Sequence, residues 1–171
     1  MESKEYKKDV RIYELISMMF KIIAGKQQLL VDSPLPQVYL CGGMRSNWQD
    51  AVIKSVEDPH EERCGFFDPR DKREEAMSTR EIVDQDLAWI DRCDVVFAYL
   101  EESNPYGANL AMEIGYAKAK GKYIIFVDEK ELREFMMARE SADKLFSSFE
   151  EGIKWFQNLI YEYTIVFKGE K

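Results

Sequence analysis

The residues of this sequence most suited to chemistry are two carboxylates set among apolar residues. Glu113 lies in NPYGANLAMEIGYAKAKGK (104–122), and Asp86 lies in the apolar stripe of a second predicted helix. A carboxylate in such a position needs a partner or a function. Two carboxylates in apolar settings can take different protonation states, one acting as a nucleophile and the other as an acid. Retaining glycosyl transfer uses such a pair.

Both carboxylates also have a purely structural interpretation. Glu113 is surrounded by small residues at helical spacing, which predict a helix face pressed against strands: Ala108, Ala111, Gly115 and Ala119. From such a face Glu113 could reach solvent or pair with a lysine. Asp86, which shares its stripe with Ile82, Trp89, Ile90 and Cys93, could instead cap a neighbouring loop.

A glycine-containing turn after a short apolar strand offers groups that bind anions. In VYLCGGMRSNW (38–48), the backbone N–H groups of Gly42 and Gly43 and the guanidinium of Arg45 could hold a phosphate or the polar edge of a sugar. Two glycines after a strand also form ordinary tight turns. Tyr39 lies on the strand that leads into this turn, as either a core residue or a site residue.

A second predicted strand ends in FFDPRDKR (66–73), which places Asp68 and Arg70 at the strand end. These two residues are candidate substrate contacts. The alternative is an ion pair that shapes the loop.

The elements that would position these residues alternate between strand and helix. Strands are predicted at 37–41, 64–67, 94–100 and 122–128, with a weaker fifth at 143–146. Helices are predicted around 48–57, at 79–93, in the stretch ending at Gly121, near 130–140 and at 149–163. Ser78 and Ser148, each followed three residues later by a glutamate, have the capping-box pattern of helix starts.

This alternation of apolar strands and helices indicates an α/β fold. We expect a flavodoxin-like or Rossmann-like three-layer sandwich with a mostly parallel sheet of four to five strands. Ligands of such sheets bind beyond the carboxyl ends of the strands, where the candidate residues lie. Residues 1–33 are predicted to be an N-terminal helical extension, 34–163 the α/β domain, and 164–171 a C-terminal tail that begins with the strand-like TIVFK.

The composition restricts the classes of function. The chain has 171 residues and a net charge of −8, so it fits one globular domain and lacks the basic excess that nucleic-acid polymers require. The three cysteines, Cys41, Cys64 and Cys93, are far apart in apolar contexts, as expected of buried thiols in a reducing cytoplasm. His60 is the single histidine, which argues against a metal site and against a Ser-His-Asp triad.

The sequence predicts neither a secretory signal nor a membrane span. The charged start of the chain does not resemble a secretory signal, and no stretch approaches the ~20 apolar residues of a membrane span. We therefore expect a cytoplasmic protein that does not bind membranes.

Four segments, taken in order, resemble the nucleoside 2-deoxyribosyltransferase family. They are VYLCGGMR, FFDPRD, DQDLAWIDRCDVVFAYL and NPYGANLAMEIGYAKAKGKYIIFV, and together they cover about residues 37–128. The most specific feature is MEIGYA after a buried strand and a glycine-containing loop, preceded at the right distance by DxDLxxIxxxDVV.

This resemblance implies roles for the candidate residues. Glu113 would attack the anomeric carbon of a 2′-deoxynucleoside and form a glycosyl-enzyme ester, Asp86 would help to protonate the departing base, and Tyr39 would position Glu113. A second base would then take the deoxyribosyl group with retained configuration. The resemblance further implies small-molecule substrates, no metal or organic cofactor, and a homo-oligomer (a dimer or larger) in which a neighbouring subunit completes each site.

One departure from the family leaves the substrate open. The transferases usually carry an aspartate six positions before the nucleophile, where this chain has Gly107, with Asn104 and Asn109 nearby as candidate substrate contacts. The turn CGGMR also resembles that of the related 2′-deoxynucleoside 5′-phosphate N-hydrolases, in which the turn binds the phosphate, a role that would fall to Arg45. A transferase, a monophosphate N-glycosidase and a non-catalytic nucleotide-binding module on the same fold are thus the three hypotheses.

Overall fold

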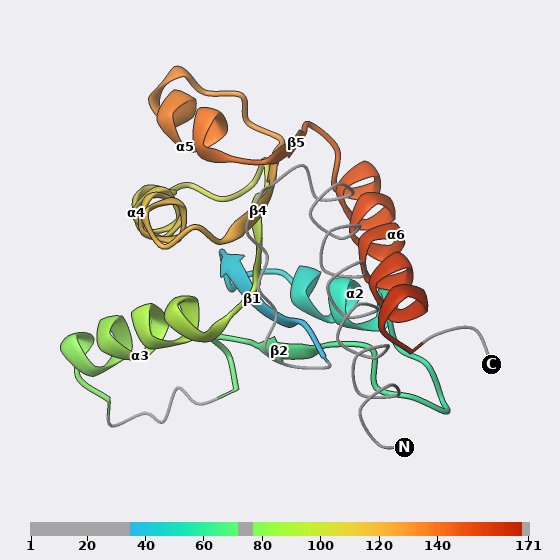
Figure 1. The fold of residues 1–171 in the computed structure, drawn as a ribbon. Coiled ribbons are helices and arrows are strands. Elements are labelled where there is room, and N and C mark those ends of the chain that lie inside the picture. Colours follow the sequence, from blue (N-terminus) through green and yellow to red (C-terminus); the bar gives the residue numbers. More distant parts are fainter. Residues whose placement is uncertain (1–34, 72–76, 169–171) are drawn as a thin grey trace, which may run out of the picture.

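The computed structural model describes residues 35–71 and 77–168, the last four of these by their backbone only. The predicted N-terminal extension, residues 1–33, lies outside the described residues. The structure has five strands: β1 (Gln37–Gly42), β2 (Gly65–Phe67), β3 (Val95–Leu100), β4 (Tyr123–Asp128) and β5 (Lys144–Phe146). All are parallel, in the order β2-β1-β3-β4-β5 (Figure 1). The predicted α/β fold with a parallel sheet is confirmed.

Helices cover both faces of this sheet (Figure 1). The helices α2 (Trp48–Ser55) and α6 (Phe149–Lys168) pack on one face, and α3 (Thr79–Arg92), α4 (Ala108–Ala119) and α5 (Met136–Ser141) pack on the other. A short 3-10 helix, η1 (Arg133–Phe135), precedes α5. The central strands β3 and β4 are buried along their whole length, which explains their continuous apolar sequence.

Alternation along β1 divides its side chains between the two cores. Val38 and Leu40 point into the core beneath α2 and α6, whereas Tyr39 and Cys41 point into the core beneath α3, α4 and α5. Tyr39 and Cys41 therefore face the helices that carry Asp86 and Glu113.

Two expectations about the helices were wrong. The buried stripe of α4 consists of Leu110, Ile114 and Ala117, and the small residues predicted to press against the sheet are exposed or half-buried. Glu113 falls within the buried stripe because it lies three residues after Leu110 and four before Ala117. The segment TIVFK is not strand-like, since α6 continues through Lys168 and extends the amphipathic helix that begins at Phe149.

The start of α3 follows its sequence pattern. The Ser78 side chain accepts a bond from the Glu81 backbone N–H, and the Glu81 carboxylate accepts one from the Ser78 backbone N–H. The predicted capping box is confirmed, and it fixes the first turn of the helix that carries Asp86.

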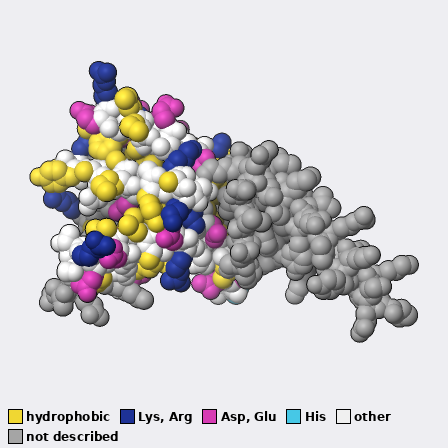
Figure 2. All heavy atoms as spheres, turned by 60° about the vertical axis from the view of Figure 1, so that its left-hand side comes forward, with side chains coloured by type: hydrophobic (Ala, Val, Ile, Leu, Met, Phe, Trp, Pro, Cys, Tyr) yellow, Lys and Arg dark blue, Asp and Glu magenta, His cyan; other side chains and the backbone are white. Residues whose placement is uncertain are grey.

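The side of the molecule formed by α3, α4 and α5 has hydrophobic side chains on its surface among charges of both signs (Figure 2). Five large apolar side chains of α4, α5 and the loops that precede them are exposed: Tyr106, Met112, Leu132, Met136 and Met137. Among the residues that the structure describes, no helix combines the length and the apolar character needed to cross a bilayer.

The glycines Gly152 and Gly115 give a matched test of helix packing. A Cβ at Gly152, in α6, would overlap the Cγ2 of Val127 in β4, whereas no described atom lies within 4 Å of a Cβ at Gly115 in α4. Gly152→Ala should lower the free energy of unfolding by about 1–3 kcal/mol through overpacking. Gly115→Ala should raise it by up to about 1 kcal/mol, because alanine favours helix. Urea denaturation of both variants checks this, and equal effects would contradict the packing of α6 on β4.

Candidate active site

The carboxyl ends of β1 and β3 form the point where the strand order reverses. From β1 the chain passes through α2 to β2 on one side, and β3 lies on the other side of β1. In sheets of this order, ligands bind in the crevice that opens at the reversal. The loops after β1 and β3 meet here. Ser46 Oγ donates to Glu101 Oε2. Gly43 lies so close to Asn104 that a Cβ on the glycine would be only 2.9 Å from Asn104 Nδ2.

Glu113 lies in the second turn of α4, half-buried, beside the end of β1. The thiol of Cys41 donates a hydrogen bond to Glu113 Oε2, with Sγ and Oε2 2.8 Å apart. Cys41 is fully buried, and the burial, followed by the charge of Glu113, raises the pKa of its thiol well above the ordinary value. The thiol therefore keeps its proton and acts as a donor to the carboxylate.

Asp86 is half-buried on α3, and its charge also raises the pKa of the Cys41 thiol. Asp86 and Glu113 lie on adjacent helices, since the Tyr116 hydroxyl of α4 donates to Asp91 of α3. Tyr39 is fully buried two residues before Cys41 on the same face of the strand, with its ring 6.4 Å from that of Trp89 in α3. The structure therefore places the three residues predicted to be catalytic on the same side of the sheet.

The glycine turn after β1 is shaped by close packing. A Cβ at Gly42 would lie 2.6 Å from the backbone oxygen of Tyr99 in β3, so only glycine allows these strands to approach. The Gly43 carbonyl accepts bonds from Trp48 Nε1 at 2.7 Å and from Gln49 Nε2 at 3.0 Å. These contacts support the tight-turn interpretation, and Arg45 is exposed on the turn they hold.

The loop after β2 contains the predicted ion pair. Asp68 is buried, and its carboxylate accepts bonds from the Arg70 backbone N–H at 2.9 Å and from Arg70 Nη2 at 2.6 Å. Arg70 Nη2 also contacts Asp50 Oδ1 of α2 at 2.5 Å, and this bond lowers the pKa of Asp50. This geometry favours the loop-shaping role of Asp68 and Arg70 over a substrate contact, because each already binds the other.

The loop between β3 and α4 carries the remaining predicted contacts. Asn104 is half-buried and accepts a bond from the Tyr106 backbone N–H at 3.1 Å, whereas Asn109 is exposed in the first turn of α4. At Gly107 a Cβ would lie 2.6 Å from Phe135 Cε1. An aspartate at position 107 would not fit unless Phe135 moved.

Two functional or organising residues escaped the sequence reasoning. Cys41 was expected only as a buried thiol, although the period of two along β1 places it on the same face as Tyr39. Asp128 ends β4, is 1% exposed, and accepts bonds from the Glu131 backbone N–H at 3.0 Å and from Arg139 Nη1 at 2.9 Å. It thereby fixes the loop that carries Phe135, and an aspartate directly after an apolar strand was the available signal.

Two cavities lie elsewhere on the molecule, and neither is lined by Glu113 or Asp86. One of about 540 Å³ lies on the α2 and α6 side of the carboxyl edge, lined by Ser46, Trp48, Tyr99, Glu101, Glu102, Ser103, Glu129 and Phe149.

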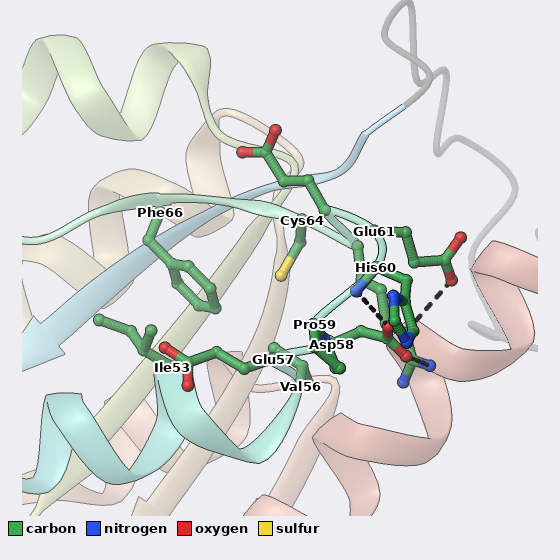
Figure 3. Close-up of a pocket in the computed structure, with 11 residues that line it drawn as sticks. Ile53, Val56, Glu57, Asp58, Pro59, His60, Glu61, Cys64 and Phe66 are labelled. Atoms are coloured by element: carbon green, nitrogen blue, oxygen red, sulfur yellow. Dashed lines mark hydrogen bonds and ion pairs between the residues drawn. The ribbon is translucent and has the colours of Figure 1, made fainter.

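The other cavity, of about 450 Å³, lies between α2 and the start of β2 (Figure 3). Its loop is closed by its own bonds, from the His60 backbone N–H to Asp58 at 2.9 Å and from Arg63 to Asp58 at 2.5 Å. The amino end of β2 lies at the opposite edge of the sheet from the crevice, so we assign this second cavity no part in the chemistry.

One of three similar solved structures shares this fold with a TM-score above 0.5, at low sequence identity. A 2-deoxyribosyltransferase from Bacillus psychrosaccharolyticus has a TM-score of 0.53 and 18% identity, over 67% of this chain and 88% of that chain. A CMP N-glycosidase from Clostridium botulinum has a TM-score of 0.48 and 19% identity, over 69% and 94% of the two chains. A 2-deoxyribosyltransferase from Leishmania mexicana has a TM-score of 0.49 and 18% identity, over 72% and 97%.

Sequence comparison gives a more direct assignment. No curated protein matches the chain. The sequence profile of the family Nucleoside 2-deoxyribosyltransferase matches residues 38–150, which run from the second residue of β1 past β5 and include every candidate site residue. Since this match extends over more than half of the 171 residues, the chain belongs to the nucleoside 2-deoxyribosyltransferase family.

Proposed function

We propose that this protein cleaves the N-glycosidic bond of 2′-deoxynucleosides and transfers the deoxyribosyl group to another base. The observation that carries this proposal is the hydrogen bond from Cys41 to Glu113 at the carboxyl edge of the sheet. It gives one carboxylate a donor that favours its ionised form, and the adjacent helix α3 carries the second carboxylate, Asp86. Those are the two groups that a retaining double displacement requires.

In the proposed reaction, a Glu113 oxygen attacks C1′ while the bond from C1′ to the base nitrogen breaks. The bonding electrons leave with the base, which takes the proton of Asp86. A nitrogen of a second base then attacks C1′, and Glu113 departs as a carboxylate. Asp86 takes the proton that the attacking nitrogen loses. The charge on Glu113 also stabilises the oxocarbenium-like transition state of both steps. Tyr39, buried on the same strand face as Cys41, is proposed to position Glu113.

The second candidate is hydrolysis of deoxynucleoside 5′-monophosphates, which the exposed Arg45 on the glycine turn would favour. The charge beside that turn argues against it. Ser46 follows Arg45 directly and lines the same cavity as Glu101, Glu102 and Glu129. Three carboxylates around this neighbouring cavity would repel a phosphate dianion held by the turn, so we favour the uncharged nucleoside as substrate.

A base-exchange assay tests the reaction. Deoxyinosine and free adenine should give deoxyadenosine, and Glu113→Ala should lower the rate by at least about 10³-fold, because no other group would form the ester. Chromatography of the products measures this. Absence of both base exchange and base release with every common deoxynucleoside would contradict the proposal, and a rise in melting temperature without any product would favour the binding module.

The same assay with 5′-monophosphates separates transfer from the hydrolase alternative. Base release from monophosphates without an acceptor base, lost in Arg45→Ala, would support the hydrolase. We expect the uncharged nucleoside to react faster than its monophosphate, and little effect of Arg45→Ala on the nucleoside reaction.

The proposed acid role of Asp86 has its own test. Asp86→Asn should slow exchange from deoxyinosine by about 10²–10⁴-fold, the usual contribution of a general acid. It should slow release from 7-methyl-2′-deoxyguanosine far less, because that base departs without needing a proton. Asp84→Asn is the control, since Asp84 is exposed on the same helix and pairs with Arg80 at 2.9 Å. Equal losses with both substrates would contradict an acid role.

We further propose a homo-oligomer, as the family resemblance implies. Tyr106, Met112, Leu132, Met136 and Met137 give the α4 and α5 side an apolar surface of the kind that marks interfaces.

Analytical ultracentrifugation tests this arrangement. The protein should sediment as a dimer or larger species, and Met137→Lys should shift it toward monomer, because a charge would be buried in the interface. Tyr161→Lys, at an exposed residue of α6 on the opposite face of the sheet, should not. A fully active wild-type monomer would contradict the proposal.

A further inference from the structure

We propose that Cys41 is a positioning residue for Glu113: its thiol donates a hydrogen bond that orients the carboxylate and favours its ionised form. This inference rests on the proposed function, in which Glu113 must be ionised to attack C1′. It adds a residue from β1 to the groups that prepare the nucleophile.

The first argument is geometric. Cys41 is the last residue of β1 that points into the core beneath α3, α4 and α5, and the following residue is Gly42. Gly42 is packed so closely against the Tyr99 backbone that the end of β1 has little freedom to shift. The thiol therefore lies at a fixed position, 2.8 Å from Glu113 Oε2, at the edge where ligands of this sheet type bind.

The second argument is electrostatic. A thiolate at this position would face the charge of Glu113, which raises the pKa of Cys41 after burial itself. The thiol therefore keeps its proton throughout the neutral range and remains a donor. A donor to the ionised form of a carboxylate lowers its pKa, so the bond offsets part of the cost of half-burying Glu113.

The other two cysteines show that this arrangement is particular to Cys41. Cys93 Sγ donates to the Ile90 carbonyl oxygen at 3.3 Å, an ordinary contact at the end of α3. Cys64 is buried at the start of β2, beside the cavity at the opposite edge of the sheet. Burial raises the pKa of each of these thiols to about 12. Among the described cysteines, Cys41 alone donates to a carboxylate.

The pH dependence of exchange provides the first test. In Cys41→Ala the acid limb of kcat/KM should move to higher pH by roughly one unit, because Glu113 loses a donor to its charged form. Cys41→Ser keeps an O–H donor and should retain the wild-type limb. Cys64→Ala, which removes a buried thiol elsewhere, controls for packing loss and should also retain it. An unmoved limb in Cys41→Ala, or equal shifts in all three variants, would overturn the proposal.

Two spectroscopic measurements report the contact without turnover. The infrared S–H band of Cys41, assigned by its loss in Cys41→Ala, should shift as Glu113 titrates, whereas the Cys93 band should not. The Glu113 carboxyl pKa, followed by ¹³C NMR and assigned with Glu113→Gln, should rise in Cys41→Ala and not in Cys64→Ala. Constant Cys41 frequency or an unchanged Glu113 pKa would overturn the contact. A wild-type protein that shows both signatures but no turnover would instead overturn the proposed reaction.

Discussion

The central physical constraint of this protein is the cost of placing a carboxylate in the buried stripe of α4. A charge removed from water is unstable unless nearby groups donate to it or its pKa rises. Glu113 meets this requirement at the carboxyl edge of the sheet. There α4 lies beside the end of β1, and the buried thiol of Cys41 donates to the Glu113 carboxylate. The helix cannot bury Leu110, Ile114 and Ala117 without also bringing Glu113 against β1. The residues that pack α4 on the sheet therefore also determine where the Glu113 carboxylate lies.

The charged residues at the other strand ends have structural roles. Asp68 after β2 binds Arg70, and Asp128 at the end of β4 binds Arg139. In each case the aspartate is nearly fully buried and also caps backbone N–H groups of its own loop. These pairs fix the loops that follow β2 and β4. Asp86 and Glu113 lie on the helices α3 and α4 rather than in these loops, which agrees with the roles proposed for them.

The contact between Gly107 and Phe135 bears on the choice of base. By resemblance, position 107 carries an aspartate in most transferases, and here Phe135 of η1 occupies the space next to the glycine. Asp128 holds the loop that carries this ring, so the space beside position 107 depends on the loop after β4. In this chain that space is filled by an aromatic side chain from a different element.

The sequence by itself determined the fold class, the five strands, most of the helices and the capping box of α3, because periodicity and apolar runs are local properties. It also singled out Glu113, Asp86 and Tyr39, since their spacing matches the family motif.

Only the tertiary structure decided which face of α4 is buried. Small residues and large apolar residues both recur at helical spacing, and packing on the sheet selects Leu110, Ile114 and Ala117. The contact between Cys41 and Glu113 was equally beyond the sequence, because the two residues are 72 positions apart and meet only when β1 and α4 pack together. Burial and pairing, which long-range packing sets, likewise decided between the two interpretations of Asp68 and Arg70, in favour of the loop-shaping ion pair.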